Sequence, residues 1–169
     1  MNLLVVGAGE MGRWLADTVD ADVAFTDADP AVAEAAAEPR SARAVPTDTD
    51  ESFDAVGLAV PMSVVEAAVT DYAANAEAAI FDISGVMDRP LAAMADHATE
   101  VERASFHPLF APPRVPGNIA VVTAAAGPTL TAIREAMTAA GNTVFETTAA
   151  EHDAAMETIQ AGAHTAVLA

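Results

Sequence analysis

The chain has 169 residues, 53% of them hydrophobic, which is enough to bury one well-formed core and leaves little for a second. Its formal net charge is −18, and so acidic a surface repels nucleic acid and anionic membranes, which excludes both as expected partners. The sequence has no cysteine, which excludes disulfides and thiolate metal sites, and we expect no bound metal.

The acidic excess also predicts the surroundings of the protein. All 7 basic residues are arginine, and self-repulsion of so many carboxylates is screened where the Debye length falls to about 3 Å, near 1 M salt. The sequence shows neither a positively charged leader nor an apolar stretch of membrane-spanning length. We therefore expect a halophilic, soluble and cytoplasmic protein.

Short apolar runs alternate with helical stretches along the chain. This alternation is typical of a parallel sheet with helices on both faces. The sequence therefore predicts an α/β fold of the Rossmann type, a doubly wound and mostly parallel sheet. The predicted strands are Asn2 to Val6, Ala21 to Thr26, Ala42 to Val45, Asp54 to Ala59, Ala78 to Asp82, Val101 to Ser105, Asn118 to Thr123 and Asn142 to Glu146.

The first strand runs directly into Gly7-Ala8-Gly9-Glu10-Met11-Gly12, a dinucleotide-binding fingerprint. We expect Gly7 to make the tight turn, Gly9 to let the backbone approach a pyrophosphate, and Gly12 to bring the next helix close to the strand. The start of that helix directs free N–H groups at the phosphates. The whole run is therefore the predicted cofactor-binding loop, although a purely structural glycine turn is the alternative.

Asp27, at the end of the second strand, indicates which dinucleotide binds. Its carboxylate is placed to accept hydrogen bonds from the adenosine ribose and would repel the extra phosphate of NADP, so we expect NAD as the cofactor. Asp27 could instead cap the following helix, but Asp29, just before Pro30, is the better cap.

Three further helices are predicted before the end of the sheet region. The helix from Glu10 to Val19 repeats Met11, Leu15 and Val19 on one side, which is typical of core contacts. The alanine-rich segment from Ala31 to Ala37 has high helix propensity. We expect another helix to begin at Pro61, with Val64, Val65, Ala68 and Val69 facing inward and Pro61 beside the cofactor.

The pattern changes near Thr147. Thr148 and Glu151 form a capping box that opens a long final helix, so we expect a nucleotide-binding domain over 1–147 and the start of a helical domain over 148–169. The apolar residues 166–168 need a partner surface. Either a second copy of the chain or a further helical region would provide it.

Two candidate catalytic residues follow predicted strands. Ser84 comes after the strand that ends at Asp82, and His107, before Pro108, comes after the next one. The carboxyl ends of parallel strands share one edge of the sheet, where ligands bind, so both side chains could face one cavity. On local grounds each could equally be an ordinary turn or loop residue.

The segment Ser105-Phe106-His107-Pro108-Leu109-Phe110-Ala111-Pro112 resembles the His-Pro loop of the prephenate and arogenate dehydrogenases of tyrosine biosynthesis. The run Glu151-His152-Asp153, followed by Gln160 and His164, resembles the opening of that family's helical domain. The glycine loop and Asp82-Ile83-Ser84 also fit. Members of the family oxidise and decarboxylate their substrate with NAD or NADP, and they form dimers.

The resemblance implies roles for individual residues. His107 would accept the proton of the substrate ring hydroxyl as hydride leaves for the nicotinamide, and Ser84 would orient that hydroxyl and His107. His152, Gln160 and His164 would contact substrate, or they could be solvated or hold a partner helix. The family also uses an arginine in its helical region to bind the substrate carboxylate. No residue of this sequence matches that arginine. Arg114, just after the His-Pro segment, could meet a carboxylate but is better explained as a surface residue.

Two other function classes remain open. One is a related helical-dimer dehydrogenase acting on a 3-hydroxyacid or an imine, but those enzymes commonly use a lysine and this sequence has none. The other is a nucleotide-sensing regulatory module, like those of potassium-uptake systems. Such a module does not require Ser84 or the His107-Pro108 segment, so both features favour an enzyme.

Overall fold

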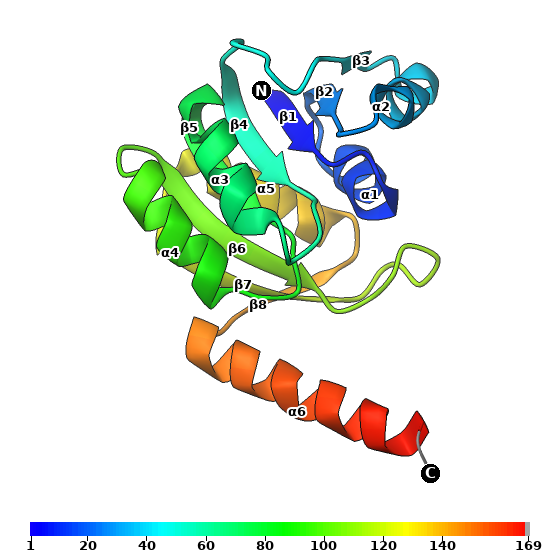
Figure 1. Ribbon diagram of the computed structural model, residues 1–169, viewed down its shortest axis with the longest axis vertical. Coiled ribbons are helices and arrows are strands. Elements are labelled where there is room, and N and C mark those ends of the chain that lie inside the picture. Colours follow the sequence, from blue (N-terminus) through cyan, green and yellow to red (C-terminus); the bar gives the residue numbers. More distant parts are fainter. Residues whose placement is uncertain (168–169) are drawn as a thin grey trace.

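The fold is built on one eight-stranded sheet, shown in Figure 1. The structure, a computed structural model, describes the backbone of residues 1–167 and the side chains of residues 1–158. The strand order is β3-β2-β1-β4-β5-β6-β7-β8, and its first six strands have the order of a dinucleotide-binding Rossmann sheet. The strands are β1 (Asn2–Val6), β2 (Asp22–Thr26), β3 (Arg43–Ala44), β4 (Phe53–Leu58), β5 (Ala76–Asp82), β6 (Glu102–Pro108), β7 (Asn118–Ala125) and β8 (Thr143–Glu146).

Strands β1 to β6 are parallel to one another, whereas β7 pairs with β6 in the antiparallel direction and β8 runs parallel to β7. Six α-helices and two short 3₁₀ turns accompany the sheet in the described residues. The prediction of a doubly wound, mostly parallel α/β sheet is confirmed. The helices are α1 (Glu10–Thr18), α2 (Pro30–Ala37), α3 (Val65–Tyr72), α4 (Asp88–His97), α5 (Pro128–Ala139) and α6 (Ala149–Val167), and the 3₁₀ turns are η1 (Glu38–Arg40) and η2 (Ala73–Asn75).

The sheet is buried on both faces, which explains its continuous apolar strands. In β1, Leu3 and Val5 belong to a core cluster shared with α1, α2 and α5, whereas Leu4 and Val6 belong to the cluster shared with α3 and α4. Figure 1 shows α3 and α4 in front of the sheet and α5 behind it. Because successive side chains point to opposite faces, neither face of this strand tolerates a polar residue.

The structure shifts several predicted boundaries by one or two residues and corrects two of them by three or more. Strand β6 continues to Pro108, beyond the predicted end at Ser105, because its antiparallel pairing with β7 extends to Pro108 opposite Ile119. The helix predicted from Pro61 begins only at Val65, since residues 62–64 form a turn, and Val64 is 46% exposed rather than facing inward. The other predicted inward-facing residues of α3 are buried.

Both predicted helix caps are confirmed. The Asp29 carboxylate accepts the N–H of Ala31 at 3.0 Å at the start of α2. At the start of α6, the Thr148 hydroxyl accepts the Glu151 N–H at 3.2 Å and donates to the Glu151 carboxylate at 2.9 Å. Helix α6 therefore begins where the capping box predicts.

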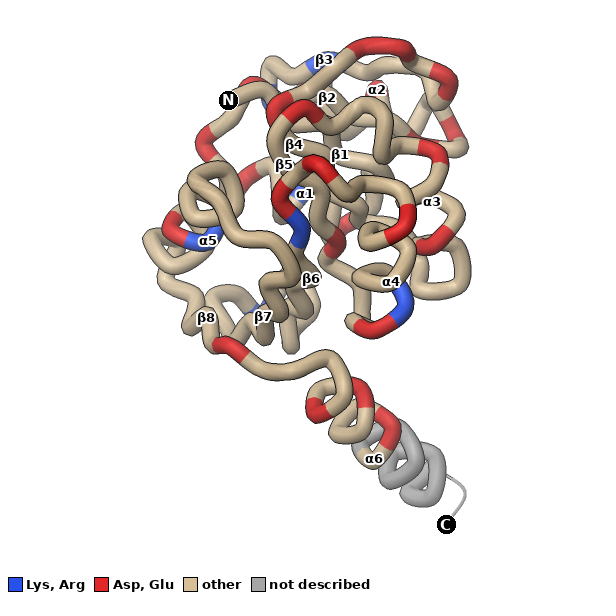
Figure 2. Tube along the Cα trace, turned by 90° about the vertical axis from the view of Figure 1, so that its left-hand side faces the viewer, with Lys and Arg blue, Asp and Glu red and all other residues tan. Residues whose placement is uncertain are grey.

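Acidic residues are distributed over most of the described chain, as Figure 2 shows, and basic residues are few. Over the described residues, we find no helix with both the length and the apolar character needed to cross a membrane.

Two glycines allow close packing around the turn from β1 into α1: Gly7 against the end of β4, and Gly12 where α1 meets β1. Gly7 has a φ of +95°, and a Cβ there would be 2.5 Å from the carbonyl oxygen of Ala59. A Cβ on Gly12 would overlap the carbonyl oxygen of Gly7 and press on Val5. At Gly9, in contrast, a Cβ would have no heavy atom within 4 Å.

Gly12→Ala should therefore destabilise the fold by about 1–3 kcal/mol, the usual cost of overpacking, because α1 must move off β1. Denaturant unfolding at constant salt measures this effect. Gly9→Ala is the matched control and should cost under about 1 kcal/mol, as expected for a poorer helix cap. An equal loss of unfolding free energy in the two variants would contradict this account of the α1–β1 contact.

Candidate functional site

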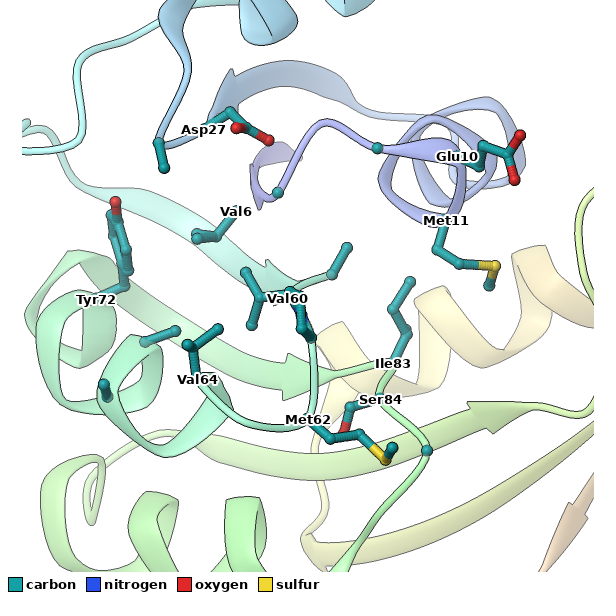
Figure 3. A pocket seen from close by; sticks show the side chains of 18 of the residues that line it. Val6, Glu10, Met11, Asp27, Val60, Met62, Val64, Tyr72, Ile83 and Ser84 are labelled. Atoms are coloured by element: carbon teal, nitrogen blue, oxygen red, sulfur yellow. The ribbon is translucent and has the colours of Figure 1, made fainter. Parts of the chain in front are cut away.

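A cavity of about 1070 Å³ opens at the carboxyl edge of the parallel strands. It extends from the loop after β1 to the end of β6, and Figure 3 shows Asp27 and Ser84 far apart along its wall, with Val60 between them. Small-molecule sites are typically about 300–1,000 Å³, so this cavity suits an extended ligand. The predicted site residues that line it are Gly7, Gly9, Glu10, Met11, Asp27, Pro61, Ser84 and His107.

At one end of the cavity, the glycine loop presents backbone rather than side chains. Gly9 is the N-cap of α1 and offers no side-chain acceptor to the first amides of the helix. Those amides therefore remain free for a ligand, and the helix dipole favours a negative one. Ala8 and Gly12 of the predicted loop are buried and support it from behind.

Asp27 anchors this loop. Its carboxylate accepts the N–H of Ala8 at 2.8 Å and that of Asp29 at 3.0 Å. The Gly7 N–H donates to the carbonyl of Thr26, also at 2.8 Å. The end of β2 thus holds the glycine loop in place and leaves a carboxylate on the cavity wall, where the sequence predicts a ribose contact.

At the other end of the cavity, Ser84 is tied to a buried acid. Asp82, the last residue of β5, is wholly buried, and its Oδ2 accepts the Ser84 hydroxyl at 2.6 Å and the Ser84 N–H at 2.9 Å. Burial raises the pKa of Asp82 to about 6, although the hydrogen bonds from Ser84 oppose the shift. Among the described residues, the hydroxyl contacts Asp82 and the Val86 carbonyl, at 3.1 Å, rather than His107 as the resemblance implies.

His107 lies near the end of β6, on the cavity wall. Its Nε2 is 3.6 Å from the position that a Cβ on Gly85 would occupy, so this nitrogen lies beside Gly85, which also lines the cavity. Burial lowers the pKa of His107 to about 4, with a further lowering from His152 and an opposing effect from Asp153. The imidazole is therefore neutral at pH 7.

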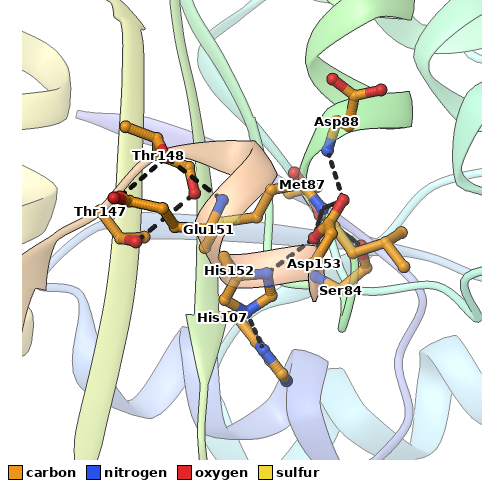
Figure 4. Close-up of polar contacts among 11 residues, drawn as sticks. Ser84, Met87, Asp88, His107, Thr147, Thr148, Glu151, His152 and Asp153 are labelled. Atoms are coloured by element: carbon orange, nitrogen blue, oxygen red, sulfur yellow. Dashed lines mark hydrogen bonds and ion pairs between the residues drawn. The ribbon is translucent and has the colours of Figure 1, made fainter. Parts of the chain in front are cut away.

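His152 is buried, with 6% of its surface exposed, and contacts His107 directly. Its Nε2 is 2.7 Å from Nδ1 of His107, and its Nδ1 is 2.7 Å from Oδ1 of Asp153, as drawn in Figure 4. The two rings meet edge to face, with centroids 4.9 Å apart. The sequence predicts His152 as a substrate contact, and the structure places it against a candidate catalytic side chain.

The other candidates are placed as follows. The side chains of Gln160 and His164 lie outside the described residues. Met11 both lines the cavity and packs partly against the core. Arg114 is exposed, and the described cavity lining contains no arginine. The described residues contain no cluster of His, Asp or Glu that could hold a metal ion.

Asp153 is not among the site residues that the sequence predicts, although it belongs to the Glu151-His152-Asp153 run. Asp153 is adjacent to His152 in sequence, but the partners of both residues lie far away along the chain: His152 is 45 residues from His107, and Asp153 is 66 residues from Met87. No local pattern signals such a separation. The signal that the sequence offers is the Glu151-His152-Asp153 run at the start of α6.

No protein-family model matches the chain, and no curated protein sequence matches it. Solved structures do match its fold. Prephenate dehydrogenase from A. aeolicus in complex with hydroxyphenyl propionate and NAD⁺ has a TM-score of 0.75 at 16% identity, over 90% of this chain and 62% of that one. Synechocystis arogenate dehydrogenase has a TM-score of 0.76 at 17% identity, over 92% and 62%.

A pyrroline-5-carboxylate reductase from Streptococcus pyogenes is also similar, with a TM-score of 0.68 at 13% identity over 90% of this chain and 60% of that one. The chain thus spans less than two thirds of the length of these proteins. At such identities the likeness establishes the fold. At the level of the fold, the resemblance to prephenate and arogenate dehydrogenases inferred from the sequence is confirmed.

Comparison with Asp82→Asn should show that the raised pKa of Asp82 makes the unfolding free energy of the wild-type protein depend on pH. Between the ordinary value of 3.8 and about 6, the folded protein keeps a proton that the unfolded chain releases. The free energy of unfolding of wild type, relative to the variant, should therefore fall as the pH rises through this window, by at most about 3 kcal/mol. Urea unfolding at a series of pH values measures the difference.

The comparison with the variant is necessary because His107, with its lowered pKa, makes the opposite contribution over a similar range. Asp96→Asn, on the exposed face of α4, is the matched control. A wild-type-minus-variant difference that is independent of pH would show that Asp82 titrates normally.

Proposed function

We propose that this chain belongs to an NAD-dependent dehydrogenase that oxidatively decarboxylates prephenate or arogenate in tyrosine biosynthesis. The observation that carries the proposal is a single cavity with a glycine loop at one end and a neutral, half-buried imidazole at the other. The likeness to solved prephenate and arogenate dehydrogenases supports the proposed substrate class.

The residues at the β1–α1 end suit NAD. The free amides at the start of α1 would bind the diphosphate, and a side chain at Gly7 would collide with Ala59. Asp27 would accept hydrogen bonds from the ribose hydroxyls. Its negative charge, with no arginine in the described lining, favours NAD over NADP.

At the opposite end, His107 acts as the general base. Its neutral Nε2 would accept the proton of the substrate hydroxyl as that oxygen becomes a carbonyl. When bound, NAD supplies the acceptor for the hydride that leaves the same carbon. The electron pair of the bond to the departing carboxylate then moves into the ring and on to the carbonyl oxygen, so that the ring becomes aromatic and CO₂ is released. The phenolate oxygen takes back the proton that His107 accepted. Ser84 and Gly85 bound the space beside His107 and would orient the substrate there.

The organisation of the whole protein forms part of the same proposal. Residues 1–147 would be the nucleotide-binding domain, and 148–169 would open a helical domain through which two copies form a homodimer. Prephenate is an anion, and the described cavity lining has no arginine. Its positive contacts would therefore come from residues outside this lining.

The acidic side chains on the cavity wall also favour a second candidate function, an NAD-binding sensor module without turnover. Glu10, Asp27 and Asp71 line the cavity, and His107 is its only basic side chain among the described residues. A module of this kind would bind NAD with the same loop. It would leave prephenate and arogenate unchanged.

His107→Asn should lower kcat about 10²- to 10⁴-fold, because it removes the base while leaving the glycine loop intact. NADH formation from prephenate and from arogenate, followed at high salt, measures the rate. The affinity for NAD should be unchanged, which serves as the internal control. Undiminished turnover in the variant would exclude His107 as the base, and NAD binding without turnover in wild type would favour the sensor module.

Asp27→Asn should narrow the preference for NAD over NADP by about five- to tenfold, since one like-charge repulsion of about 1 kcal/mol is removed. Titration calorimetry with both dinucleotides measures the ratio. Asp29→Asn, which keeps a capping side chain on α2, is the matched control. An unchanged ratio of affinities would place Asp27 away from the ribose.

A further inference from the structure

Behind His107 lies a row of polar groups that the proposed mechanism does not use. His107 contacts His152, and His152 contacts Asp153, through two hydrogen bonds of 2.7 Å each. Figure 4 shows the three side chains one after another in space, with Asp153 beside Met87 and Asp88 at the start of α4. His107 comes from β6 and the other two from α6, so the row joins the final helix to the cavity.

Asp153 is held as an ionised acceptor. It accepts the backbone N–H of Met87 at 3.1 Å and of Asp88 at 3.1 Å, besides its bond to His152. Burial by itself would raise the pKa of Asp153, but the hydrogen bonds from His152 and from these amides outweigh it and lower the pKa. A carboxylate in this state accepts hydrogen bonds and donates none.

Proton positions along the row then follow one from another. Because Asp153 only accepts, Nδ1 of His152 must carry a proton. A neutral His152 then has a lone pair on Nε2, so Nδ1 of His107 must be the donor to it. Neutral His107 is left with its lone pair on Nε2, the nitrogen beside Gly85 on the cavity wall.

We propose that His152 and Asp153 are positioning residues that hold His107 as its Nδ1–H tautomer, with the basic Nε2 directed at the substrate. The inference rests on the proposed function for the role of that base, but the tautomer itself is a property of the free protein. The opposite tautomer would present an N–H to the substrate hydroxyl and could not take its proton. Helix α6 therefore contributes to the chemistry without touching the reacting atoms.

Asp153→Asn should reverse the direction of the hydrogen bonds that link residue 153, His152 and His107. The asparagine oxygen is needed by the N–H groups of Met87 and Asp88, which leaves its NH₂ facing Nδ1 of His152. His152 would then become the donor through Nε2, and His107 would be protonated on Nε2. A comparable tautomer reversal in serine proteases costs about 10⁴ in kcat. We expect kcat to fall about 10²- to 10⁴-fold, with NAD affinity unchanged.

The deciding experiment is long-range ¹H–¹⁵N NMR of the free chain at pH 8, which distinguishes protonated from unprotonated ring nitrogens. The chain has 4 histidines, so single substitutions assign the signals. Wild type should show His107 and His152 both protonated on Nδ1. Asp153→Asn should move both protons to Nε2, whereas Glu157→Gln, which removes one exposed charge from the same helix, should change neither.

Each outcome bears on the proposal separately from the enzymatic activity. Wild-type His107 protonated on Nε2 would overturn it, whether or not the Asp153→Asn variant folds. So would unchanged tautomers in a folded form of that variant. His152→Gln offers a rescue, since its amide can accept from His107 and donate to Asp153, and it should keep the wild-type tautomer of His107. Correct tautomers without NADH formation would instead refute the proposed reaction alone.

Discussion

The close approach of helix α1 to strand β1 is the constraint on which the cavity depends. Gly7 and Gly12 leave no room for side chains between the turn, the helix and the carbonyl of Ala59. This contact directs the start of α1 at the sheet edge. The cavity then follows from the parallel strand order, because the carboxyl ends of β1, β4 and β5 open on the same side.

Burial acts in opposite directions on the two titratable groups at the far end of the cavity. It disfavours charge on Asp82 and on His107 alike, so the pKa of the acid rises to about 6 and that of the base falls to about 4. The neutral imidazole is suited to proton acceptance at pH 7. Asp82 holds Ser84 by its hydroxyl and its N–H, which fixes the loop that faces His107.

The final helix has two functions in this structure. Its first turns are anchored to the nucleotide-binding fold by Asp153, which caps the start of α4. The same carboxylate orients His152 and, through it, His107. Any change in the position of α6 therefore reaches His107, the proposed base, through two hydrogen bonds. This coupling gives a physical reason for a helical segment directly after the sheet.

The sequence by itself determined the features that depend on neighbouring residues: the glycine loop, the caps at Asp29 and Thr148, the positions of eight strands, and the placement of Ser84 and His107 at the sheet edge. Only the tertiary structure decided the antiparallel direction of β7, the late start of α3 at Val65, and the contact of His152 with His107. Periodicity and capping are local properties, so a single sequence displays them. Strand direction and contacts between distant side chains depend on how the whole chain packs, and no local pattern encodes that.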